Sequence, residues 1–245
     1  MAVTTDVLRQ LKSIWQLAFN EPPAAIDGFF AIAFSPDRCR YLTENGVPVS
    51  ALYWLDCEYE GGKLAYIYAV ATHPDHCGKG LASQLLNETH AHLKALGYAG
   101  AVLKPANGLF PFYERLGYKT SGYIRRFSAE ASNNPIPIRQ LSAAAYGLLR
   151  RSYLPENGIR QEGVTLDFLD TFAAFYASED ALVCVAKEEP VILEYLGNRN
   201  SAPGILASLE INSAEIPTPG DEIPFAMFYP LNCTKTPGYL GITLE

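Results

Sequence analysis

The sequence lacks the features that mark membrane proteins and nucleic-acid-binding proteins. No apolar run reaches the ~20 residues that a membrane-spanning helix needs. Residues 1–15 have no basic start followed by an apolar stretch, so we expect no secretory signal. Lysine and arginine number 19 against 26 acidic residues, and they form no basic block. We therefore expect neither a membrane nor a nucleic acid as a partner.

Cysteine is scarce and scattered. The five cysteines are odd in number and include no CxxC pair. This pattern predicts neither a disulfide framework nor a zinc site. The glycine–lysine spacing of a P-loop and the GxGxxG pattern of dinucleotide-binding folds are also missing. We expect no metal, and a cytoplasmic location in which thiols stay reduced.

The chain does contain enough apolar sequence to build a core. Hydrophobic residues make up 49% of its 245 residues, which suffices for one large or two small domains. Residues 130–137 have no periodicity and combine two prolines with two asparagines. We therefore predict a first domain over 1–128, a linker over 129–137 and a smaller α+β domain over 138–245.

The first domain is predicted to begin with two helices and continue with a sheet. Thr4 or Thr5 can cap the first helix, and the prolines at 22–23 can start the second. The next stretch alternates β-branched and aromatic residues and is cut by Asn45-Gly46 and Gly61-Gly62. It predicts antiparallel strands near 38–43, 48–59 and 63–72. A helix from Leu81 to Leu96, a short strand, a short helix and a further strand or pair of strands over 118–130 follow.

The second domain is predicted from weaker signals. Ser142 can cap a helix, with Leu141 and Tyr146 placed for a hydrophobic staple. Thr165 is expected to cap another helix, and residues 181–196 read as a hairpin followed by a short helix near 203–209. We also expect strands at "FAMFYPL" and at "GYLGITL", the latter running to Glu245. The helix after Thr165 carries an aromatic stripe formed by Phe168, Phe172, Phe175 and Tyr176.

The stretch "HPDHCGKGLASQLL" at 73–86 joins a predicted strand to a predicted helix through Gly-Lys-Gly. Glycines allow several backbone N–H groups to converge on one point, and the helix N-terminus adds partial positive charge. Lys79 adds a full charge. This arrangement is typical of phosphate binding, although a glycine pair at a helix start can equally be a tight turn.

Together with "LKPANGLFPFYERLGYK" at 103–119, this stretch resembles the GCN5-related N-acetyltransferase (GNAT) family. The resemblance covers roughly residues 5–126. It implies an α/β GNAT fold, with a mixed, mostly antiparallel central sheet flanked by helices. The C-terminal α+β domain could then be a degenerate second GNAT-like unit.

The resemblance also implies a site for acetyl-CoA as co-substrate. In the family, a pattern Arg/Gln-x-x-Gly-x-Gly/Ala binds the pyrophosphate, and here it aligns with residues 77–82, with Cys77 replacing the long polar side chain. The preceding strand would bind the pantetheine arm and supply amides near the thioester carbonyl. The implied cofactor-binding residues are Val70, Ala71, Thr72, Gly78, Lys79, Gly80, Leu81, Ala82, Ser83 and Asn107.

Tyr113 aligns with a tyrosine that, in many family members, protonates the departing thiolate. A phenol with a pKa of about 10 suits that task. Tyr113 could instead be a core aromatic, and Asn107, followed by glycine, could equally be only a turn. No general base is assigned, because Asp56 and Glu58 are read as solvated carboxylates. His90 and His92 are expected on the polar side of a helix.

The function implied is an N-acetyltransferase acting on the amine of a small molecule or peptide, with no covalent enzyme intermediate. We expect the second domain to help form the acceptor pocket. The alternative is a CoA-binding sensor or scaffold that keeps the fold without turnover, and the departure at Cys77 supports it. Release of thiol from acetyl-CoA in the presence of amines would distinguish the two.

Overall fold

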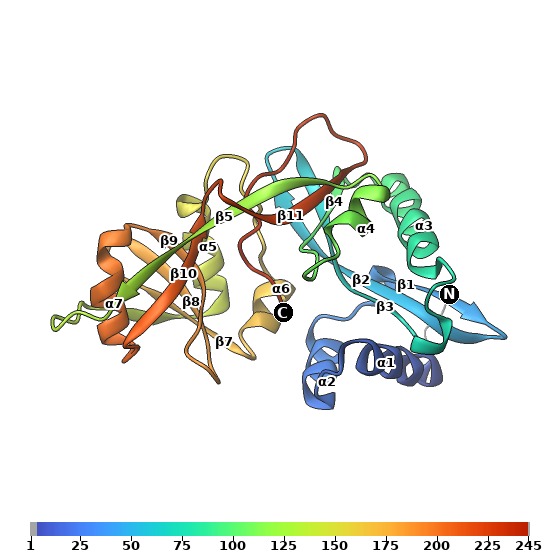
Figure 1. Cartoon of the computed structure of the whole chain (residues 1–245), viewed down its shortest axis with the longest axis horizontal. Helices are drawn as coiled ribbons and strands as arrows, with labels where there is room; N and C mark the ends of the chain where they lie inside the picture. The colour runs from blue at the N-terminus through green and yellow to red at the C-terminus, as the bar shows by residue number, and fades with distance from the viewer. Residues whose placement is uncertain (1–3, 245) are drawn as a thin grey trace. The chain divides into compact units, whose positions relative to one another are not determined.

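The computed structural model describes residues 4–244, which form two compact units (Figure 1). The first unit comprises residues up to Cys57, Gly62–Lys119 and Phe228–Thr234. The second comprises Glu58–Gly61, Thr120–Met227 and the residues from Lys235 onward. No helix in this described range has the length and hydropathy to cross a membrane.

The sheet of the first unit is formed by four strands in chain order and is completed by the end of a fifth. These are β1 (Cys39–Glu44), β2 (Val47–Tyr59), β3 (Gly62–Thr72) and β4 (Gly100–Leu103), with the end of β11 (Ile223–Pro230) beside β4. β1 and β2 pair antiparallel, whereas β3 and β4 pair parallel. The three strands predicted between residues 38 and 72 are thus confirmed, and positive φ at Asn45 and Gly46 forms the first turn.

Helices flank this sheet, as the sequence predicted. They are α1 (Thr5–Phe19), α2 (Pro23–Ile32), α3 (Leu81–Ala95) and α4 (Phe110–Arg115), with 3₁₀ turns η1 (Pro36–Arg38) and η2 (Pro74–His76). The Thr4 side chain caps α1 by accepting a hydrogen bond from the Val7 amide. α1 packs on β2 and β3 through Trp15, whose ring centroid lies 5.2 Å from that of Tyr53 on β2 and 5.4 Å from that of Tyr68 on β3.

The second unit contains a four-stranded antiparallel sheet and a further group of strands. The sheet has the order β6 (Arg139–Leu141), β7 (Ala173–Ala177), β8 (Ala181–Ala186) and β9 (Ile192–Gly197). The long strand β5 (Lys119–Glu130) lies between β11 and β10 (Ser213–Pro219). The helices of this unit are α5 (Ala143–Tyr153), α6 (Val164–Leu169) and α7 (Ala202–Ser208), with the turn η3 (Arg199–Ser201) before α7. Ser142 caps α5 as predicted.

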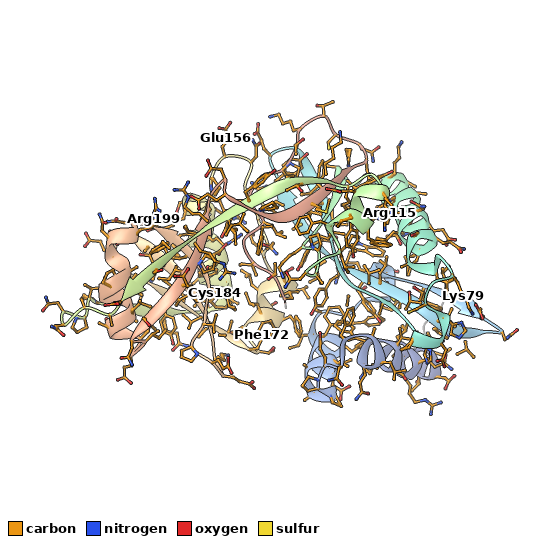
Figure 2. All side chains as sticks on the ribbon, in the orientation of Figure 1. Lys79, Arg115, Glu156, Phe172, Cys184 and Arg199 are labelled. Atoms are coloured by element: carbon orange, nitrogen blue, oxygen red, sulfur yellow. The ribbon has the colours of Figure 1, made fainter. Side chains whose placement is uncertain are left out.

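The aromatic helix predicted after Thr165 is wrong. α6 begins after Gly163, so Thr165 lies inside the helix, where it is buried. The helix ends at Leu169, while Phe175 and Tyr176 belong to β7. Figure 2 shows Phe172 in the segment that joins the two elements. A short apolar run fits a buried strand as well as a helix, and here pairing with β8 decides the outcome.

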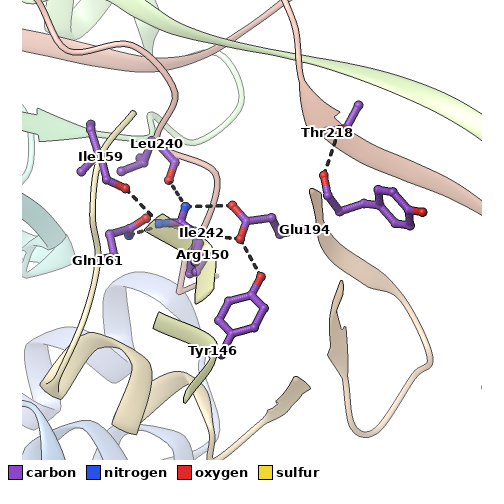
Figure 3. Close-up of polar contacts among 9 residues, drawn as sticks. Tyr146, Arg150, Ile159, Gln161, Glu194, Thr218, Leu240 and Ile242 are labelled. Atoms are coloured by element: carbon purple, nitrogen blue, oxygen red, sulfur yellow. Dashed lines mark hydrogen bonds and ion pairs between the residues drawn. The ribbon is translucent and has the colours of Figure 1, made fainter. Parts of the chain in front are cut away.

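The strand predicted at "GYLGITL" is also wrong, and Glu245 lies outside the described residues. Residues 235–244 have no regular secondary structure, and Gly241 adopts a left-handed φ of +76°. Side chains hold this segment instead (Figure 3). Arg150 Nη2 donates to the Leu240 carbonyl at 3.1 Å, and Gln161 Nε2 donates to the Ile242 carbonyl at 2.8 Å. The segment therefore satisfies backbone groups without a sheet partner.

Arg150 forms a buried ion pair with Glu194 at the centre of this arrangement (Figure 3). Its Nε and Nη2 atoms each donate to a Glu194 oxygen at 2.8 Å, and its Nη1 donates to the Ile159 carbonyl at 2.9 Å. The Tyr146 hydroxyl donates to the same carboxylate at 2.7 Å. Both charged side chains are almost completely buried, with 2% and 0% of their surface exposed. The ion pair is therefore compensated by hydrogen bonds on both partners.

Candidate functional site

The strands β3 and β4 separate part-way along the first unit's sheet. Their parallel register covers only Leu64–Tyr66 of β3 and Gly100–Val102 of β4. β3 continues to Thr72, whereas β4 ends at Leu103. Within the described chain, the end of β3 from Val70 to Thr72 therefore has no strand partner on its β4 side. Its backbone groups on that side are available to an extended ligand, in the manner of an added strand.

Ala69 marks the place where β3 changes course. Its φ of +47° lies in the left-handed region, which residues with a Cβ rarely adopt. Such outliers persist only where the surrounding structure fixes them, and they are enriched at functional sites. The bend lies between the continuous buried run of β3, which ends with Ile67 and Tyr68, and the segment Val70–Thr72, in which only Ala71 is buried.

Ser50 on β2 fixes the end of β3 from the opposite side. Its buried hydroxyl donates to the Ala71 carbonyl at 3.0 Å and lies 2.9 Å from the Thr72 hydroxyl. The His73 amide donates to the Val49 carbonyl at 2.8 Å. β2 thus holds the strand at this point through both side-chain and backbone hydrogen bonds. Sequence reasoning missed Ser50, although a serine inside an apolar run is a signal for a required hydrogen bond.

The Gly-Lys-Gly loop leads from η2 into α3, and both of its glycines have positive φ. Gly78 and Gly80 both have φ of +78°, and a Cβ at either position would meet open space. After the Cys77 amide, the next amide that donates a backbone hydrogen bond is that of Gln84, which donates to the Gly80 carbonyl at 3.0 Å. Among the described residues, the amides from Gly78 to Ser83 have no acceptor. They are available to an anion at the N-terminus of a 15-residue helix.

An acidic side chain approaches this loop. Glu44, at the end of β1, places Oε2 3.2 Å from His76 Nδ1 and Oε1 3.5 Å from Lys79 Nζ. The hydrogen bond from His76, followed by the charge of Lys79, lowers the pKa of Glu44. Figure 2 shows Lys79 on the loop before α3. Sequence reasoning assigned Lys79 to the phosphate but missed Glu44, because nothing local links a hairpin turn to a loop more than thirty residues away.

Cys77 stands where the GNAT pattern has a long polar side chain. It is exposed, and its Sγ atom lies 3.8 Å from the Thr72 carbonyl oxygen and 3.6 Å from that of His73. The thiol thus contacts the backbone of the turn before the loop. No long polar side chain thus stands at this position of the loop.

Asn107 and Tyr113 follow the end of β4, on the other side of the opening. Asn107 is exposed in a turn completed by Gly108, whose φ is +82°. Tyr113 lies in α4 with 7% of its surface exposed. Its ring packs edge-on against Phe112 and Tyr118, at centroid distances of 5.0 and 5.5 Å. Asn107 and Tyr113 therefore both follow β4, the strand that pairs with the first part of β3.

The prediction that His90 lies on the polar side of a helix is wrong. His90 is not on a polar face: it is buried, with 4% exposed, whereas His92 is partly exposed. Asp56 is held by Lys63 at 3.0 Å and by the Tyr98 hydroxyl, and Glu58 pairs with Arg160 at 3.0 Å. These carboxylates thus have structural partners. Across residues 4–244 no cluster of metal-ligating side chains is present.

Comparison with known proteins supports this description. Residues 2–121 match the sequence model of the acetyltransferase (GNAT) domain family. The fold is similar to a GCN5-related N-acetyltransferase from Kribbella flavida, with a TM-score of 0.70 and 18% identity over 95% of this chain and 70% of that one. It is equally similar to a GCN5-related N-acetyltransferase from Anabaena variabilis, with a TM-score of 0.70 and 15% identity over 94% and 71% of the two chains. No curated protein matches the chain in sequence.

At these identities the likeness to solved structures shows the fold, and it extends over nearly the whole chain. The predicted α/β GNAT fold, with a mixed central sheet flanked by helices, is confirmed. A four-stranded antiparallel sheet accompanies it in the C-terminal part. Its interpretation as a degenerate second copy stays a prediction.

Proposed function

Because this chain belongs to the GNAT acetyltransferase family through residues 2–121, we propose that it moves an acetyl group directly from acetyl-CoA to an amine. The observation that carries the proposal is the combination of two features. β3 continues beyond its pairing with β4 and bends at Ala69, and the same strand leads into a loop of unpaired amides. An extended thioester with a pyrophosphate at one end fits this pair of features.

The loop binds the pyrophosphate through the amides of Gly78, Lys79, Gly80, Leu81, Ala82 and Ser83. Glycine at 78 and 80 leaves space for the phosphates and permits the positive φ values. The N-terminus of α3 adds about half a positive charge, and Lys79 can neutralise a further phosphate charge. Glu44 opposes this binding, because it engages both Lys79 and His76.

The separated part of β3 binds the pantetheine arm. The backbone groups of Val70, Ala71 and Thr72 pair with its amides, and Asn107 contacts the arm from the far side of the opening. An N–H group of this segment also stabilises the negative charge that develops on the thioester oxygen during attack. Ser50 keeps the segment in place.

Tyr113 acts as the general acid. Departure of the CoA thiolate requires a proton, and a phenol of ordinary pKa near 10 matches a thiolate of similar basicity. The amine attacks the thioester directly, so the enzyme forms no covalent intermediate. No base is assigned, since the carboxylates of β2 are engaged elsewhere. The acceptor is an amine of a small molecule or peptide, and a cytoplasmic location is part of the proposal.

The experiment is to incubate the pure protein with acetyl-CoA and a panel of primary amines and to follow thiol release. We expect thiol release that depends on an amine and is accompanied by an equal amount of acetylated product. If acetyl-CoA binds but no amine elicits thiol release, the chain is a CoA-binding sensor instead. If acetyl-CoA does not bind at all, both functions are excluded.

A further inference from the structure

The side chain of the proposed acid, Tyr113, belongs to a cluster of four aromatic side chains from separate segments. We call His90 (α3), Tyr113 (α4), Tyr118 (before β5) and Tyr229 (β11) the Tyr–His cluster. All four belong to the first unit. His90, Tyr113 and Tyr118 are buried, with 4%, 7% and 2% of their surface exposed. The cluster therefore joins Tyr113 to residues that the proposed reaction does not use.

Tyr118 contacts Tyr113 in two ways. The rings pack edge-on, with centroids 5.5 Å apart and an interplanar angle of 74°. The Tyr118 amide also donates to the Tyr113 carbonyl at 3.1 Å. α4 has six residues, too few for a helix to be stable by itself. The position of Tyr113 therefore depends on what its helix packs against, and Tyr118 is a principal contact.

Tyr118 is itself fixed by His90. Its hydroxyl lies 2.8 Å from His90 Nε2, and the His90 ring stacks on Tyr229 with centroids 4.0 Å apart and an interplanar angle of 9°. Gly117 allows this arrangement, since a Cβ there would lie 3.1 Å from the Tyr229 ring. One nitrogen of the His90 imidazole thus contacts the Tyr118 hydroxyl, and the face of the ring packs on Tyr229.

The environment keeps these groups uncharged. Burial lowers the pKa of His90 to about 4, so the ring is neutral at physiological pH. Burial, and then the neighbouring Tyr113 and Tyr229, raise the pKa of Tyr118 well above its usual value. His90 Nδ1 has no hydrogen-bond partner among the described residues, even though it is buried. An orphaned polar atom costs free energy, which a purely structural core would avoid with an apolar side chain.

We propose that Tyr118 and His90 are positioning residues: the Tyr118–His90 hydrogen bond holds the ring of Tyr118 against Tyr113 and so fixes the acid in its working orientation. This rests on the proposed function, in which Tyr113 protonates the thiolate. Neither residue touches acetyl-CoA in this scheme. Loss of the hydrogen bond should therefore slow the chemical step and leave binding of acetyl-CoA unchanged.

The test is a double-mutant cycle on kcat with an amine from the panel, using Tyr113→Phe, Tyr118→Phe and the double variant. We expect Tyr118→Phe to lower kcat about tenfold with an unchanged KM for acetyl-CoA. In the double variant, kcat should fall by the same factor as in Tyr113→Phe alone, because Tyr118 cannot orient a hydroxyl that has been removed. If Tyr118 has a purely structural role, the factor by which kcat falls in the double variant should instead equal the product of the two single-variant factors.

A second pair of variants tests His90 directly. His90→Gln keeps a polar group beside the Tyr118 hydroxyl, whereas His90→Leu removes it. We expect His90→Leu to reproduce the kcat of Tyr118→Phe and His90→Gln to recover most of the activity. Thermal unfolding and circular dichroism establish that each variant is folded.

Tyr98→Phe is the matched control. It removes a hydroxyl of another buried tyrosine in the same unit, one that donates to Asp56 and accepts from Trp54. We expect its kcat to stay within about twofold of the wild type after similar destabilisation. If Tyr118→Phe behaves like Tyr98→Phe, or if the cycle is multiplicative, the positioning role is wrong and the proposed function stands. If Tyr113→Phe itself has no effect, the acid assignment fails, and the positioning role fails with it.

Discussion

Glu44 and Lys79 form a pair between the β1–β2 hairpin and the glycine loop, with 3.5 Å between the carboxylate oxygen Oε1 and the ammonium nitrogen. The same carboxylate contacts His76. The carboxylate thus engages two side chains of the proposed pyrophosphate site. Because the pair is exposed, its attraction is weak and sensitive to salt.

We predict that Glu44→Gln strengthens binding of CoA. Removing the carboxylate releases Lys79 and His76 for the phosphates and removes a like charge from the anion site. The Kd measured by calorimetry should fall roughly threefold at low salt, and the gain should shrink near 0.5 M salt as charges are screened. Glu88→Gln, which removes a charge elsewhere on the first unit, should leave the Kd unchanged. A Kd that is the same in both variants would show that Glu44 does not compete with the phosphates.

We predict that Gly80→Val abolishes most CoA binding. The backbone at Gly80 has φ of +78°, and the β-branched side chain would project where the phosphates approach. The Kd should rise at least about tenfold. Gly97→Val is the matched control, because Gly97 has φ of +81° and equally open space at the other end of α3. Equal loss of binding in both variants would attribute the effect to backbone strain.

The sequence predicted the elements whose signals are local. Asn45-Gly46 and Gly61-Gly62 set the turns between β1, β2 and β3, and the Thr4 and Ser142 caps were recognisable from side-chain chemistry. β7 was mistaken for helix, because Phe172, Phe175 and Tyr176 also fit a helical spacing. The missing information was the pairing of β7 with β8.

The site was predictable only in part, for the same reason. The glycine loop is contiguous in sequence. The bend at Ala69, the hydrogen bond from Ser50 to β3 and the approach of Glu44 to Lys79 depend on tertiary contacts instead. His90 is different, since its signal was present. It lies four residues after the buried Leu86 and three before the buried Leu93, which places it on the apolar face. A polar residue on that face indicates a buried hydrogen bond.

We predict that the first unit loses stability in mild acid because of His90. The folded-state pKa of about 4 lies below the ordinary 6.5, so the unfolded chain binds the proton more readily. Stability is complete above pH 6.5 and declines as the pH falls toward 4. Between pH 7 and pH 5 the free energy of unfolding should fall by about 2 kcal/mol more in the wild type than in His90→Gln. Identical pH dependence in the two proteins, measured by urea unfolding, would contradict this.

We predict that Glu194→Gln strongly destabilises the second unit. The substitution leaves the Arg150 guanidinium buried without its counter-charge and removes the charged acceptor of Tyr146. Breaking a buried pair in this way costs about 3–5 kcal/mol. Arg151 and Glu162 form the matched exposed pair, so Glu162→Gln should change the unfolding midpoint little. If the two variants unfold alike, the buried pair does not hold the C-terminal segment.

The most direct measurement is hydrogen exchange of the backbone amides with and without acetyl-CoA. The amides of Gly78 to Ser83 have no acceptor among the described residues, so they should exchange rapidly in the free protein. We expect acetyl-CoA to slow exchange over residues 70–83, and to have no such effect in Gly80→Val. Protection confined to other segments, with residues 70–83 exchanging as fast as before, would show that acetyl-CoA does not bind between β3 and the glycine loop.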